Sequence, residues 1–115
     1  MNAEQLRALQ APLKTKYREL PDAARIPARA EASLDPVEIA CTVPSWHGSV
    51  TAGLHESAGG TGKLACSADM LLQALAACAG VTLRAVATAY GVEIRHGRGE
   101  FELASEPRPY GVPIG

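Results

Sequence analysis

One stretch of the sequence decides the fold: residues 67–91 read SADMLLQALAACAGVTLRAVATAYG. Alanine and leucine dominate this stretch, and both are strong helix formers. Ser67 is suited to an N-cap, Asp69 complements the positive end of the helix dipole, and Gly91 stands where a left-handed C-cap belongs. These signals predict one helix over residues 67–89, which would be about 35 Å long.

The predicted helix is apolar on almost every side. Its principal polar interruptions are Gln73, Thr82, Arg84 and Thr88. An all-round apolar helix is typical of a domain centre, and the most apolar part, residues 70–83, is short for a bilayer span of about 20 residues. We therefore predict a buried core helix and no membrane partner. Gly80 costs about 1 kcal/mol relative to alanine in a helix, which indicates that another backbone packs closely there.

The N-terminal residues 2–20 predict a second helix, an amphipathic arm. Leu6, Leu9, Leu13, Tyr17 and Leu20 fall at helical spacing. Asn2 and Gln5 form a capping-box pair at its start. Pro12 lacks a backbone N–H, so we expect a break near Ala11 and a second helical piece from Leu13.

Three short runs between the helices predict antiparallel strands over residues 26–32, 37–43 and 49–54. Asp35-Pro36 and residues 44–48 supply the turns, and the glycine-rich residues 57–63 predict a loop. After the long helix, apolar and charged residues alternate over residues 92–103 as in a strand or hairpin. Residues 104–115 show no pattern and predict an irregular tail.

These elements predict an α+β domain with an N-terminal helical arm and antiparallel strands packed on one long central helix. With 115 residues and 47% hydrophobic content, the chain suits a single domain, which we place at residues 1–103. Its 11 basic and 12 acidic residues are interspersed, giving a net charge of -1 and no basic face for nucleic acid. The N-terminus has no signal-peptide pattern, so we expect a cytoplasmic protein.

Motifs for cofactors and metals are weak. Residues 59–63 read GGTGK, but a phosphate loop also requires a glycine at Ser57 and a hydroxyl residue at Leu64. His47, His55 and His96 lack the short spacings of zinc ligands. We therefore expect neither a cofactor nor a metal.

Three cysteines remain as reactive groups, and none forms a C-x-x-C pair. Cys66 precedes the N-terminus of the long helix, where a thiolate is stabilised, so it is one candidate for a reactive thiol. Cys78 lies about 18 Å further along, too far for a disulfide with Cys66, which leaves Cys41 as the one intrachain partner open to either of them. For Cys78 itself, packing as a small hydrophobe and reactivity both stay open.

The segment from Gly53-Leu54-His55 through residues 66–83 resembles the OsmC/Ohr family of thiol-dependent hydroperoxide reductases. The likeness is centred on Ala76-Ala77-Cys78 and extends over residues 52–91. It implies that Cys78 is the peroxidatic thiol, which attacks an organic hydroperoxide to give an alcohol and a sulfenic acid.

The resemblance further implies that a carboxylate and an arginine support this thiolate. Asp69 is the nearest carboxylate, since Ser67-Ala68 replaces the family's Pro-Glu-like pair. Arg29 is the best candidate for the arginine, and Arg25 is the next.

Family members continue with further strands, a second long helix and a resolving cysteine, so we expect a partial OsmC-like fold that is truncated at its C-terminus. Exposed apolar surface, association into a homodimer and dependence on an external thiol reductant follow from this expectation. The implied role is that of an antioxidant peroxidase, an oxidoreductase of the oxidative stress response. Two alternatives are a non-catalytic dimerising module in which Cys78 only packs the helix, and a binder of apolar ligands.

Overall fold

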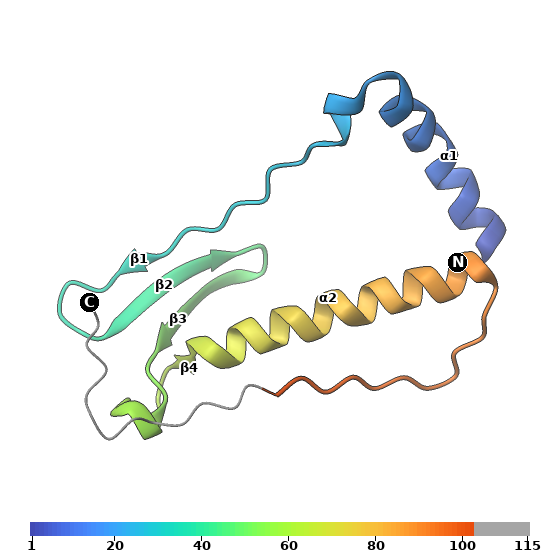
Figure 1. Cartoon of the computed structure of the whole chain (residues 1–115). Coiled ribbons are helices and arrows are strands. Elements are labelled where there is room, and N and C mark those ends of the chain that lie inside the picture. The colour runs from blue at the N-terminus through green and yellow to red at the C-terminus, as the bar shows by residue number, and fades with distance from the viewer. Residues whose placement is uncertain (103–115) are drawn as a thin grey trace. The chain divides into compact units, whose positions relative to one another are not determined.

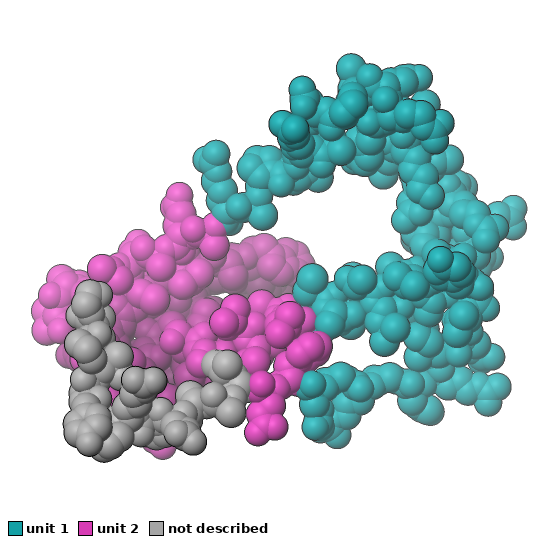
Figure 2. Space-filling model, in the orientation of Figure 1, with its two compact units in different colours: residues 1–29, 76–100 teal, residues 30–75, 101–115 magenta. Residues whose placement is uncertain are grey.

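The computed structural model describes residues 1–102, in which two α-helices accompany a four-stranded sheet (Figure 1). The predicted α+β class is confirmed. These residues divide into two compact units, one of residues 1–29 and 76–100 and one of residues 30–75 with 101–102 (Figure 2). One helix contributes to both units, and the single domain over residues 1–103 stays a prediction. The predicted tail, residues 104–115, lies outside the described residues.

Helix α1, Ala3–Glu19, begins with the predicted capping box. The Asn2 side chain accepts from the Gln5 N–H, the Gln5 side chain accepts from the Asn2 N–H, and both distances are 2.9 Å. The predicted break is wrong, because α1 continues through Pro12. Proline's fixed φ lies in the helical range, so the hydrogen-bonded turns on both sides retain the helix at the expense of one donor. A 3₁₀ turn, η1 (Pro21–Ala24), follows.

The sheet has the order β1-β2-β3-β4 and is mixed. Its strands are β1 (Ser33–Leu34), β2 (Ala40–Ser45), β3 (Gly48–Gly53) and β4 (Ala65–Cys66). The first two pairings are antiparallel as predicted, but β3 and β4 run parallel. The predicted strand over residues 26–32 is wrong, since pairing starts only at Ser33, opposite Thr42. Pro27 removes a donor from that run, which makes it a poor member of a ladder.

Two turns connect the antiparallel strands. At the predicted Asp35-Pro36 turn, Asp35 Oδ1 accepts from the N–H groups of Val37 (2.9 Å) and Glu38 (2.7 Å). The β2–β3 turn is shorter than predicted, because Ser45 already pairs with Gly48. Trp46 and His47 form its tip, where Trp46 is 97% exposed.

Helix α2, Ser67–Tyr90, follows β4 directly and agrees with the predicted helix over residues 67–89. Gly91 has a φ of 68° and ends it. The Gly91 N–H donates to the Thr88 carbonyl (3.1 Å) and the Val92 N–H to the Ala87 carbonyl (2.8 Å), which is the Schellman arrangement. The predicted C-cap is therefore confirmed.

The strand predicted after α2 is wrong for residues 92–102, which form no strand. Alternation makes a strand only where a neighbouring strand accepts its backbone hydrogen bonds. Here the chain bonds to the helix instead, because Arg84 Nη1 donates to the Ile94 carbonyl at 3.2 Å.

The side chains of α2 are mostly exposed. Ala87 is its one buried residue in the described chain, so the predicted burial of the helix is wrong. The expected exposed apolar surface is confirmed on this helix by Leu71, Leu75, Val81, Leu83, Val86 and Tyr90. A Cβ placed on Gly80 would meet nothing within 4 Å beyond its own helix, so the close backbone expected there is not supplied by the described residues.

By length and composition alone, α2 is also apolar enough to cross a membrane. Core helices pass the same test, and the absence of a membrane partner stays a prediction.

Candidate functional site

Cys78 is an exposed, free thiol in the middle of α2. On a helix, the residues one turn away on the same side are those three and four positions distant. For Cys78 these are Ala74, Leu75, Val81 and Thr82, and none carries a charge. The thiol therefore lies in an apolar but open setting, to which its own helix brings no cation within one turn.

Asp69, the predicted carboxylate, lies in the first turn of α2. Nine residues separate it from Cys78, which places it about 13 Å away along the axis and on the opposite side of the helix. The structure does not bring these two residues together through α2.

Arg29, the predicted cation, lies between η1 and β1 in a segment without regular structure. Within residues 1–102 it makes no hydrogen bond and no ion pair. The second candidate, Arg25, is 3.7 Å from Asp22 in an exposed ion pair. The roles of Arg29 and Asp69 stay predictions.

The sheet separates the other two cysteines. Cys41 on β2 lies opposite Ala52 on β3, and Cys66 on β4 lies opposite Gly53, the next residue of β3. Two strand spacings place the Cα atoms of Cys41 and Cys66 about 9 to 10 Å apart, beyond the reach of a disulfide. Adjacent β3 positions also face opposite sides of the sheet. The sheet therefore excludes the Cys41–Cys66 disulfide that the sequence left open.

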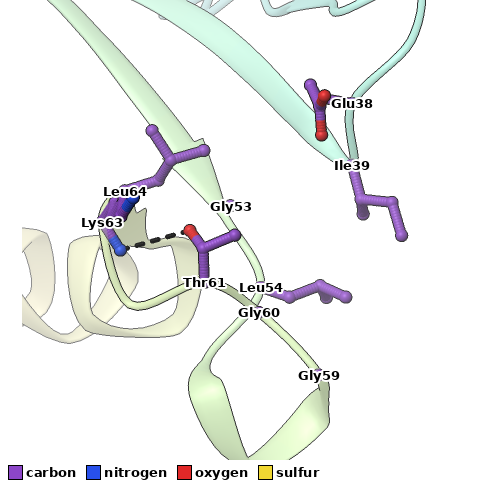
Figure 3. Close-up of a pocket in the computed structure, with 9 residues that line it drawn as sticks. All are labelled: Glu38, Ile39, Gly53, Leu54, Gly59, Gly60, Thr61, Lys63 and Leu64. Carbon is purple, nitrogen blue, oxygen red and sulfur yellow. Dashed lines mark hydrogen bonds between the residues drawn. The ribbon is translucent and has the colours of Figure 1, made fainter.

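A pocket of about 400 Å³ in the unit of residues 30–75 is a feature that the sequence reasoning missed (Figure 3). It is lined by Glu38, Ile39, Gly53, Leu54, Gly59, Gly60, Thr61, Lys63 and Leu64. The lining is partly apolar and partly polar. It combines leucine and isoleucine side chains, exposed glycine backbone and one charged side chain of each sign. No cysteine borders it, so the pocket does not supply a substrate site for a thiol.

The glycine-rich loop that borders the pocket is held by His55. The ring Nδ1 accepts from the Ser57 N–H at 3.1 Å and lies 2.7 Å from the Ser57 hydroxyl oxygen. The His55 carbonyl accepts from the Gly60 N–H at 3.0 Å. A Cβ on Gly60 would overlap the Leu54 carbonyl, so glycine is required there. This run of glycines was the one sequence signal for the pocket.

Within residues 1–102, no three histidine, cysteine or acidic side chains come together as metal ligands. No protein-family model, curated protein or solved structure matches this chain. The OsmC/Ohr resemblance and the roles taken from it therefore remain predictions from the sequence.

Proposed function

We propose that this chain is a cytoplasmic thiol redox protein that reduces organic hydroperoxides through Cys78. The observation that supports the proposal most is the exposure of Cys78 on a largely apolar helix. An exposed thiol can meet a hydroperoxide, and the surrounding hydrocarbon suits an alkyl-substituted peroxide better than hydrogen peroxide.

The proposed reaction begins with the Cys78 thiolate. Its sulfur attacks the terminal peroxide oxygen, the O–O bond breaks, and the leaving alkoxide takes a proton to become an alcohol. Cys78 is oxidised to a sulfenic acid. An external thiol then condenses with the sulfenic acid to release water, and a second thiol reduces the mixed disulfide and restores Cys78.

We assign Arg29 as the cation and Asp69 as the carboxylate that support this thiolate. A cation near a thiolate stabilises it, and a carboxylate orients the guanidinium through paired hydrogen bonds. Since α2 alone keeps Asp69 away from Cys78, these two assignments are separate from that of the nucleophile.

The experiment treats the reduced protein with one equivalent of cumene hydroperoxide. A dimedone-type probe then traps sulfenic acid, and mass spectrometry locates it. We expect the label on Cys78 and its loss in Cys78→Ser, with Cys41→Ser and Cys66→Ser as matched controls that retain it. Label on Cys41 or Cys66 alone, or only after denaturation, contradicts the proposal.

The second candidate is a non-catalytic dimerising module in which Cys78 packs the helix. The exposed apolar residues of α2 favour this reading, because such surface is typical of an interaction site. If the chain is such a dimerising module, Cys78→Ser should leave peroxide consumption unchanged but weaken self-association. Under the peroxidase proposal, the same variant abolishes consumption.

A further inference from the structure

The 400 Å³ pocket is built from three segments of one compact unit, residues 30–75 (Figure 3). Glu38 and Ile39 lie just before β2, Gly53 ends β3 and is followed by Leu54, and residues 59–64 lead into β4. Backbone pairing of β2 with β3 and of β3 with β4 holds the three segments together. The pocket therefore lies where the sheet fixes its walls, and its volume is in the range of small-molecule sites.

The glycine-rich loop that forms one wall is fixed at both of its ends. The hydrogen bonds of His55 hold its start, as described above. At its end, Gly62 has a φ of 72°, and a Cβ placed on it would overlap the Glu56 carboxylate, so the Glu56 side chain lies against this glycine. A wall that is already ordered does not have to be ordered by a ligand, which favours binding.

Two opposite charges border the pocket but do not meet. Figure 3 shows Glu38 and Lys63 on either side of Gly53. Within residues 1–102, neither side chain forms an ion pair. A ligand that carries an ammonium group at one end and a carboxylate at the other would match both side chains.

The backbone donors of the loop are already used. The N–H groups of Gly59 and Gly60 donate to backbone carbonyls earlier in the loop, and the Lys63 N–H donates to the Thr61 hydroxyl at 3.2 Å. The loop therefore lacks the array of free N–H groups that binds phosphate, and the Glu38 carboxylate would repel a dianion. The Lys63 ammonium and the hydrogen of the Thr61 hydroxyl remain as donors, which suits a single carboxylate.

We propose that this pocket binds a short zwitterionic peptide with apolar side chains. Its ammonium group pairs with Glu38, its carboxylate pairs with Lys63, and its side chains lie against Leu54 and Leu64. A free amino acid carries both charges on one carbon, whereas each added residue separates the termini by up to about 3.6 Å, so a peptide reaches both ends. No cysteine takes part, so the proposal is independent of the peroxidase reaction.

The first test titrates the protein with leucyl-leucine and follows the backbone amides by NMR. We expect a Kd below about 1 mM, with shifts at Gly53, Gly60 and Thr61 and none in α1. N-acetyl-leucyl-leucine and leucyl-leucine amide each lack one terminal charge and should bind about fivefold more weakly. Free leucine should bind at least tenfold more weakly, and inorganic phosphate should not shift these amides.

The second test removes each charge from the protein. Glu38→Gln should raise the Kd for leucyl-leucine about fivefold without raising the Kd for the N-acetyl peptide, which has no ammonium group. Lys63→Gln should do the same with the peptide amide. Glu31→Gln and Lys14→Gln are matched controls that lie outside the pocket and should leave every Kd unchanged.

Three results would overturn the peptide site. The first is equal affinity for leucyl-leucine and its two blocked forms, which would make the charges irrelevant. The second is binding of free leucine or phosphate as tight as that of the dipeptide. The third is an absence of shifts at the pocket amides with about 10 mM leucyl-leucine.

Discussion

At the scale of the residue, Cys78 combines exposure with an apolar neighbourhood. Its side chain fills no space in the described chain, so a structural need for sulfur at this position is absent there. The exposure of the thiol supports the reactive interpretation of Cys78, one of the two that the sequence left open.

We expect Cys78→Ser to change the free energy of unfolding by less than about 0.5 kcal/mol, as for other exposed sites without special contacts. Urea denaturation followed by circular dichroism measures this. Cys78→Ala is the control for the hydroxyl group. A loss of 2 kcal/mol or more in both variants would indicate a packing role.

Within residues 1–102, Asp35 is the group whose pKa clearly departs from its ordinary value. The N–H groups of Glu38 and Val37 donate to its carboxylate and hold its pKa below the ordinary value. A lowered pKa in the folded state means that the carboxylate stabilises the β1–β2 turn above about pH 4, and that this contribution disappears as the pH falls through the folded pKa.

We therefore expect amide exchange protection at Val37 and Glu38 to fall below about pH 4, after correction for the intrinsic pH dependence of exchange. In Asp35→Ala this added acid dependence should be absent. Asp22→Ala, which removes an exposed carboxylate in η1, is the control and should retain it.

At the scale of the element, both helices were predictable because their signals are local. Asn2 and Gln5 cap α1 within one turn, and Gly91 ends α2 through hydrogen bonds to its last turn. The strands were less predictable, because a segment forms a strand only where another strand pairs with it. Residues 92–102 alternate as a strand does but have no neighbour, whereas the two-residue β4 exists because it pairs with β3.

Pro12 tests how far α1 tolerates a missing donor. We expect Pro12→Ala to stabilise α1 by up to about 3 kcal/mol, because it restores a backbone hydrogen bond and removes the ring's clash. Helical content by circular dichroism should rise across the thermal transition. Ala11→Gly is the opposite control and should lower it by about 1 kcal/mol. Unchanged helicity in Pro12→Ala would contradict this account.

At the scale of the whole molecule, the sequence located the apolar helix but not its environment. A helix that is apolar all round reads as buried, yet its burial depends on surfaces that no local pattern encodes. The same limit applies to the site. Cys78 could be proposed from its own helix and the resemblance centred on it, whereas the roles proposed for Asp69 and Arg29 depend on how distant segments meet.

The exposed apolar side of α2 around Cys78 predicts low solubility. Charged substitutions on that side should raise the solubility. We expect Leu71→Glu with Leu75→Lys to raise the polyethylene glycol concentration needed for precipitation while leaving the unfolding free energy within about 1 kcal/mol. An unchanged precipitation threshold in this variant would contradict this account.

The β2–β3 turn carries the one tryptophan of the sequence, Trp46, almost fully in water. An indole already surrounded by solvent emits as it does in an unfolded chain, so its fluorescence should change little when the protein unfolds. The same position makes it a sensitive optical probe of anything that touches the hairpin tip, because contact would shift the emission to shorter wavelength and shield it from acrylamide quenching. The chain thus carries a built-in reporter of encounters at this end of the sheet.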